Sequence, residues 1–92
     1  MRKKYRSHVG VLLDILQAIS EENEPTITRI IYRANISHDR LKKYISRLLE
    51  QGYIRKKEVN GRIIYFLTDK GVKLMRELQL VRSVFDVLGF QL

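Results

Sequence analysis

The sequence is short and basic: 92 residues carry 18 Lys or Arg against 10 Asp or Glu, for a formal net charge of +8, and 45% are hydrophobic. This length allows one domain, residues 1–92, and the absence of cysteine excludes disulfides and thiolate metal sites. No apolar run approaches the roughly 20 residues that cross a bilayer, and the basic residues 2–6 precede no uninterrupted apolar segment. We therefore expect no membrane contact, no secretory signal and a cytoplasmic location.

The first predicted element is an amphipathic helix over residues 7–22. Ser7 is a suitable N-cap, and Asn23, in a left-handed conformation, and Pro25 would end the helix. Apolar residues recur on one face at helical spacing. They are Val9, Leu12, Ile15, Leu16 and Ile19.

Two helices joined by a tight turn follow. After an extended piece at 25–27, Thr28 is the expected N-cap of a helix over 29–34, and Asn35 and Ser37 bound a turn with Ile36 in the core. The next helix, over 38–51, has a buried stripe, with Tyr44 at its margin. The stripe consists of Leu41, Ile45, Leu48 and Leu49.

A hairpin is predicted next, with strands at 53–59 and 62–67. Asn60-Gly61 between them is the strongest short signal for a type I′ turn. A two-residue loop pairs Val59 with Arg62, and by the same register Lys57 with Ile64, Arg55 with Phe66 and Ile54 with Leu67. Four side chains are then expected on the core face. They are Ile54, Ile63, Tyr65 and Leu67.

The last predicted helix covers residues 69–88 and begins at a Thr68 N-cap. One set of its apolar residues repeats at spacings of four, three, four and three, which is typical of a coiled-coil seam. A second strip adds Leu80, Val84 and Val87, more apolar surface than a monomer of this size would cover. We expect the first set to form a dimer interface. It consists of Leu74, Leu78, Val81, Phe85 and Leu88.

The order of these elements predicts an α+β, mostly α, winged helix-turn-helix over residues 1–68 with a C-terminal dimerisation helix and tail at 69–92. Residues 29–62 hold ten Lys or Arg against three acids, so their net charge of +7 is nearly the whole excess. Such clustering favours a polyanionic partner, and we expect double-stranded DNA, bound by a transcriptional regulator or small chromatin protein.

The predicted DNA contacts fall on three elements. Within the recognition helix, Lys43, Ser46 and Arg47 are the candidates for base reading, whereas Arg40 and Lys42 point toward phosphates. The full predicted set is Ser37, His38, Arg40, Lys42, Lys43, Ser46 and Arg47 on the recognition helix, Thr28, Arg29 and Arg33 on the helix before it, and Arg55, Lys56, Lys57, Asn60, Gly61 and Arg62 on the wing.

Parts of the sequence resemble a family of small archaeal winged-helix proteins, which includes chromatin-associated proteins and virus- or plasmid-encoded regulators. The resemblance covers about residues 26–78 and rests on three blocks. It implies a dimer through the C-terminal helix, commonly an antiparallel coiled coil, with both recognition helices turned toward DNA. The blocks are Thr28-Arg29-Ile30-Ile31-Tyr32 with Ala34-Asn35-Ile36-Ser37, Leu41-Lys42-Lys43-Tyr44-Ile45, and Leu67-Thr68-Asp69-Lys70-Gly71.

Other functions fit the sequence less well. His38, Asp39 and the distant His8 are too few for a catalytic or metal site, so we expect no enzyme, cofactor or metal. An effector pocket in the dimer interface is disfavoured because the seam holds no polar residue, and we expect no small-molecule ligand. Tyr32 and Tyr44 are assigned to half-buried core positions. The alternative function is a protein-interaction winged helix whose basic face binds an acidic partner.

Overall fold

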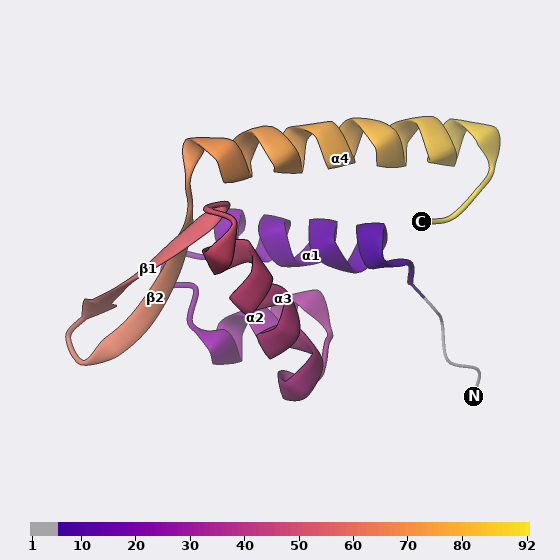
Figure 1. Cartoon of the computed structure of the whole chain (residues 1–92). Coiled ribbons are helices and arrows are strands. Elements are labelled where there is room, and N and C mark those ends of the chain that lie inside the picture. Colours follow the sequence, from indigo (N-terminus) through magenta and orange to yellow (C-terminus); the bar gives the residue numbers. More distant parts are fainter. Residues whose placement is uncertain (1–5) are drawn as a thin grey trace.

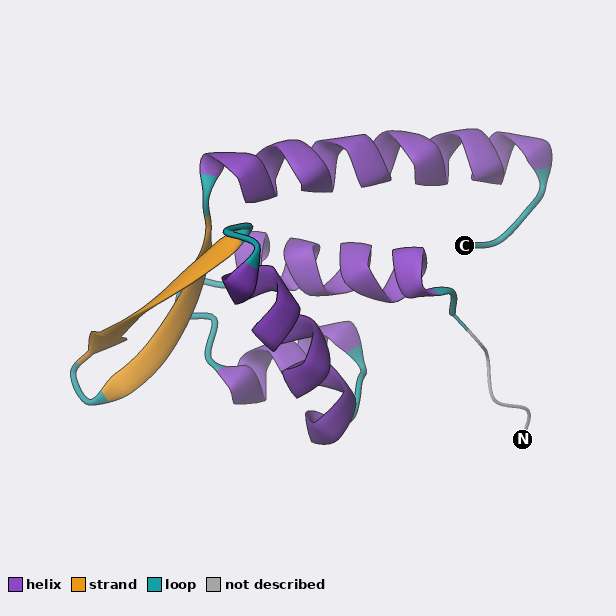
Figure 2. Ribbon diagram, viewed as in Figure 1, coloured by secondary structure: helices purple, strands orange, loops and turns teal. Residues whose placement is uncertain are grey.

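The computed structural model describes residues 6–92, so residues 2–5 of the basic N-terminal stretch lie outside the described part. Over this range α1 lies between α4 on one side and α2 with α3 on the other, and the hairpin extends from one end (Figures 1 and 2). None of these helices combines the length and hydrophobicity that crossing a membrane requires. The elements are α1 His8–Glu21, α2 Ile27–Ala34, α3 His38–Glu50, β1 Ile54–Val59, β2 Arg62–Leu67 and α4 Asp69–Leu88.

Helix α1 is the central element of the core. Its start is as predicted, because the Ser7 hydroxyl oxygen accepts a hydrogen bond from the Gly10 amide at 3.1 Å. Since neighbouring elements cover two sides of α1, burial extends beyond one stripe: Val11 and Leu13 are fully buried. The prediction for Val9 is wrong, because this residue lies in the first turn, where 36% of it remains exposed.

The connection from α1 to α2 corrects two predictions. Thr26, not Thr28, is the N-cap of α2, and its hydroxyl oxygen accepts from the Arg29 amide at 3.3 Å. Asn23 does not adopt the left-handed conformation predicted for it. The reason is tertiary: this connection runs beside β2, where the Tyr65 amide donates to the Pro25 carbonyl at 3.0 Å.

The turn between α2 and α3 is confirmed. Asn35 is left-handed, with φ of 53°, and ends α2. Ile36 is buried in the core, and the Ser37 hydroxyl oxygen accepts from the Arg40 amide as the N-cap of α3. In α3 the predicted stripe is also confirmed in the main, with Leu41, Ile45 and Leu48 buried and Leu49 half-buried.

The hairpin has the predicted register, with Val59 opposite Arg62 and Ile54 opposite Leu67. Asn60 and Gly61 both have positive φ, as a type I′ turn requires. One assignment is wrong: Ile63 is 44% exposed, whereas Ile64, on the opposite face, is buried. Ile63 lies near the tip, beyond the helices, and Ile64 lies in a hollow beside the α1–α2 connection.

Helix α4 has the predicted bounds and the predicted Thr68 cap, whose hydroxyl oxygen accepts from the Gly71 amide at 3.1 Å. Gly71 is buried so closely against the hairpin that a Cβ there would lie 2.0 Å from the Tyr53 carbonyl oxygen. From this point α4 runs back along α1 (Figure 1). Asp14 of α1 links the two helices, accepting from Arg82 at 2.9 Å and from Arg6 at 2.7 Å.

Candidate nucleic-acid interface

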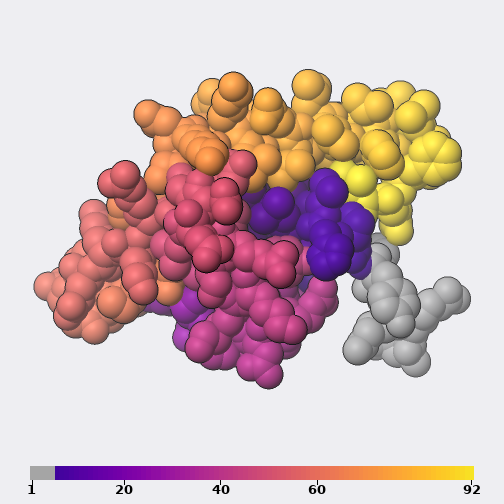
Figure 3. All heavy atoms as spheres, in the orientation of Figure 1, coloured from indigo at the N-terminus to yellow at the C-terminus, as the bar shows by residue number. Residues whose placement is uncertain are grey.

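The exposed side of α3 is the most basic helical surface that the sequence predicted. Its buried stripe fixes the helix against the core, so the remaining side chains project into solvent. In the space-filling view α3 lies at the surface between the hairpin and the start of α1 (Figure 3). The residues of the predicted set that α3 and its cap expose are Ser37, His38, Arg40, Lys42, Lys43, Ser46 and Arg47.

The hairpin places a second group of cations beside this helix. Arg55 and Lys57 are two residues apart on β1, so their side chains share one face of the hairpin. Arg62, which pairs with Val59, lies on the same face, whereas Lys56 points to the other face. All four are exposed. Figure 2 shows the hairpin as a narrow arm that extends from the helices. Arg62 lies beside the turn at its tip, whereas Arg55 lies near its base.

The sequence matches the family model described as winged helix-turn-helix over residues 5–85. The chain belongs to the winged helix-turn-helix family. The uncharacterized protein MJ0287 of Methanocaldococcus jannaschii is 36% identical to it over 88 residues, covering 96% of this chain and 82% of that protein. The predicted fold and the predicted resemblance to archaeal winged-helix proteins are thereby confirmed.

Solved structures agree with this family. Sso10a-2, described as a DNA-binding protein from Sulfolobus solfataricus, superposes with a TM-score of 0.79 and 31% identity, covering 90% of this chain and 85% of that one. SSV1 F-93 superposes with a TM-score of 0.71 over 95% of this chain and 99% of that one. At 12% identity this second likeness shows the fold alone. In winged-helix terms α3 is the recognition helix and the hairpin is the wing.

Arg40, Lys43 and Arg47 of the recognition helix gather around one hollow of about 230 Å³. Its other lining residues are Tyr44 and His8, which sequence reasoning did not place at the interface. His8 Nδ1 lies 2.8 Å from the Tyr44 hydroxyl. Tyr44 is half-buried, as predicted, but its spacing gave no sign of contact with α1. The only signal in the sequence was that two cations flank Tyr44, with Lys43 directly before it and Arg47 three residues after it.

The predicted cations of α2 are already paired with the acidic end of α1. Arg33 forms ion pairs with Glu21 and, at 3.1 Å, with Glu22, and Arg29 lies 3.7 Å from Glu22. These contacts explain why α1 ends in acidic residues although they oppose its dipole. Thr28 is exposed within α2.

Two further positions differ from expectation. Tyr32, assigned to the core, is 86% exposed because it lies on the outer side of α2. On the wing, Arg62 pairs with Glu24 at 3.1 Å, whereas Lys57 lies over the Phe66 ring, its Nζ 5.7 Å from the centroid. Ion pairs this exposed contribute only about 0.2–1 kcal/mol.

The predicted seam of α4 does not lie on one open face. Leu74 and Leu78 pack against the core of the same chain, because this side of α4 faces α1. Phe85 is half-buried with Phe90 edge-on at 6.3 Å, and only Val81 and Leu88 of the seam are exposed. Exposed aliphatic residues instead occupy the outward side of the second half of α4. We call these the α4 patch: Leu80, Val81, Val84, Val87 and Leu88.

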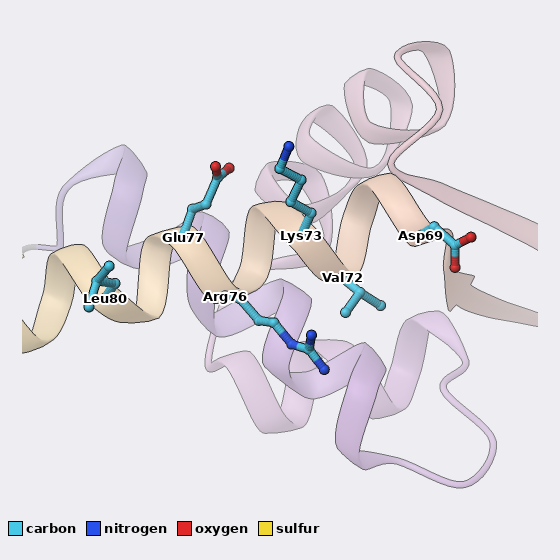
Figure 4. A pocket seen from close by; sticks show the side chains of 6 residues that line it. All are labelled: Asp69, Val72, Lys73, Arg76, Glu77 and Leu80. Atoms are coloured by element: carbon cyan, nitrogen blue, oxygen red, sulfur yellow. The ribbon is translucent and has the colours of Figure 1, made fainter.

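The outward side of the first half of α4 is charged. Figure 4 shows Lys73 and Glu77 projecting to one side of the helix and Arg76 to the other, with Leu80 following them. The same side of α4 therefore carries both signs of charge and then turns aliphatic. A surface of this kind suits a helix partner with charges of both signs.

Proposed function

We propose that this winged helix-turn-helix protein binds double-stranded DNA and acts in transcriptional regulation or as a small chromatin protein. The observation that supports this most directly is the cluster of Arg40, Lys43 and Arg47, exposed on the recognition helix. Among the described residues these three cations form no ion pair. The family supports the same function, as does the DNA-binding protein Sso10a-2 at 31% identity.

In the proposed complex the recognition helix enters the major groove, which is about 12 Å wide. Lys43 lies nearly opposite the buried stripe, with Ser46 to one side of it and Arg47 to the other. Lys43 and Ser46 would face the base edges. Lys42 lies on one flank of the helix, while Arg40 and Arg47 lie on the other, next to His8. Because Arg47 lines one hollow with Arg40 and His8, we propose backbone contact for it in place of the base reading expected from the sequence. Lys43 also lines this hollow and therefore borders both the base-facing surface and the backbone contact.

The remaining predicted contacts belong to the elements beside the recognition helix. Asn60 and Gly61 would bring the tip of the wing close to the DNA backbone, with Lys56 and the cations of the opposite face as phosphate contacts. Thr28, Arg29 and Arg33 of α2 would approach the backbone from the other side, after exchange of their present acidic partners.

We infer that a second copy of the chain covers the α4 patch. Within the described residues these five side chains stay 39–86% exposed. The charges ahead of them are of both signs, which favours a like helix over an acidic or basic partner. A homodimer would present two recognition helices. A two-fold protein prefers half-sites about 34–36 Å apart or a multiple of that spacing.

Fluorescence anisotropy with labelled duplex DNA, repeated across salt concentrations, tests this function. If each protomer neutralises three to five phosphates, the slope of log K against log salt is about −5 to −9 for the dimer. Unlabelled duplex should compete better than the matching single strand. An affinity for duplex no greater than that for single strands or for an acidic polypeptide would refute DNA binding and favour the acidic-partner alternative.

Arg47→Ala and Arg33→Ala form a matched pair for the same titration. Both remove one exposed arginine, but only Arg33 has carboxylate partners within its own chain. Loss of Arg47 should flatten the slope by about 0.9 per protomer and weaken all duplexes alike. Loss of Arg33 should change the slope less, and equal effects would show that pairing within the chain does not select the contacting cations.

A further inference from the structure

We propose that the hollow between the start of α1 and the recognition helix holds one phosphate group, with Arg40, Lys43 and Arg47 supplying charge and the His8–Tyr44 pair supplying a directed hydrogen bond. This inference rests on the proposed function in one respect, since it takes the phosphate from the DNA backbone. It also assigns a role to α1, which the sequence analysis left outside the interface.

The shape of the hollow suits a small anion. Its volume of about 230 Å³ is far more than one water molecule needs, and it lies between α3 and the first turn of α1. Arg40, Tyr44 and Arg47 are spaced i, i+4 and i+7, so they line one flank of α3. In the proposed complex that flank faces the wall of the DNA groove, where the phosphates lie, and not the floor, where the base edges lie.

The charge of the hollow is unbalanced. Three of its five lining residues are cations, and none is an acid. By contrast, ion pairs within the described chain already engage five other arginines. These are Arg6, Arg29, Arg33, Arg62 and Arg82. The hollow thus gathers three cations with no carboxylate in its lining, a positive site that favours an anion.

The contact between His8 and Tyr44 always leaves one donor free. If the Tyr44 hydroxyl donates to Nδ1, the neutral ring carries its proton on Nε2. If Nδ1–H donates to the Tyr44 oxygen at 2.8 Å, the hydroxyl proton is free instead. Each arrangement offers one N–H or O–H to an acceptor, and a phosphate oxygen accepts hydrogen bonds from both kinds of donor.

A duplex in which single phosphates are replaced, one at a time, by neutral methylphosphonate tests the site. With the wild type we expect one position per half-site at which the replacement weakens binding about tenfold. In a His8→Ala, Tyr44→Phe double variant, which keeps the three cations, the loss at that position should fall to about three- to fivefold, and adding Arg40→Gln with Arg47→Gln should remove what remains, while the other positions keep their sensitivity. Lys57→Ala, a matched loss on the wing, should leave that position sensitive.

A second arm uses inorganic phosphate without DNA and follows the ring resonances of the two histidines by NMR. Phosphate should shift the His8 resonances to saturation and leave those of His38 almost unchanged, and Arg40→Gln with Arg47→Gln should abolish the shift. Arg40 and Arg47 are exposed, so the variants should fold. The dispersion of resonances in the NMR spectrum verifies that they do. The Tyr44→Phe change preserves the ring that packs in the hollow.

The two arms separate the possible results. A phosphate-dependent shift of His8 in a protein that binds no duplex would refute the proposed function and assign the hollow to a free anion. A second result would refute the phosphate site and leave DNA binding standing. In it the protein binds duplex, the His8 and Tyr44 changes alter the effect of methylphosphonate at no position, and phosphate does not shift the His8 resonances. A sensitive position together with a saturable shift supports both.

Discussion

Substitution of one residue of the α4 patch by aspartate tests the proposed dimer most directly. The five side chains of the α4 patch are between 39% (Val81) and 86% (Val87) exposed. Added together, their exposed surface equals that of about three fully exposed side chains. Complete burial of a Val or Leu is worth about 1.5–3 kcal/mol, so two protomers gain about 9–18 kcal/mol. Association itself costs about 4–15 kcal/mol, and a micromolar dimer requires about 8 kcal/mol net.

Val84→Asp should dissociate this dimer. It removes a side chain near the middle of the patch and places an ionised carboxylate in each half of the interface, at an effective cost of several kcal/mol per ion. Because Val84 is half exposed in the single chain, the variant should keep its fold. Sedimentation equilibrium from low micromolar to about 100 µM should then show a dimer for the wild type and a monomer for Val84→Asp.

Two controls separate the α4 patch from the seam expected from the sequence. Gln79→Glu adds a charge to another side of the same helix with no change of shape and should leave the dimer intact. Leu78→Asp should lower the thermal midpoint of the monomer itself, because Leu78 packs against the core. A wild type that stays monomeric at tens of micromolar, or a Val84→Asp variant that still dimerises, would refute this reasoning.

Three further predictions concern stability. Gly71→Ala should lower the free energy of unfolding in urea by about 1–3 kcal/mol, since its Cβ would meet the Tyr53 carbonyl oxygen; an unchanged value would contradict this packing. Asp14→Asn should cost about 1–2 kcal/mol at low salt and less at high salt, because two arginines lose their carboxylate; a loss independent of salt would count against an electrostatic cause. Burial raises the pKa of the Tyr65 hydroxyl above 10.0. The stabilisation from the neutral phenol is therefore present below about pH 10 and lost as the pH rises through the folded value, so alkaline urea titrations should show a steeper fall for the wild type than for Tyr65→Phe.

Short-range signals in the sequence predicted most of the fold. Asn60-Gly61 fixed the hairpin register because a type I′ turn needs positive φ at both residues and leaves two residues unpaired. Ser7, Ser37 and Thr68 each cap the helix predicted to follow them. The physical reason is that caps and turns are decided by hydrogen bonds spanning two to four residues.

The same local reasoning failed where two candidates competed within a few residues. Thr26 and Thr28 both resemble N-caps, and the choice depends on how the α1–α2 connection pairs with β2. Likewise Ile63 and Ile64 are adjacent and equally apolar. Their burial depends on how far the helices reach along the wing and on which face the connection covers.

For the candidate site, the sequence by itself determined which elements are basic, and only the tertiary structure decided which cations are free to bind. Arg33 and Arg47 look alike in the sequence, but α1 brings two carboxylates to the first and His8 beside the second. The α4 patch was decided in the same way, because the spacing of the apolar residues defines stripes but not the stripe that α1 covers. Charge and periodicity are properties of the chain, whereas pairing and burial depend on contacts between residues far apart along it.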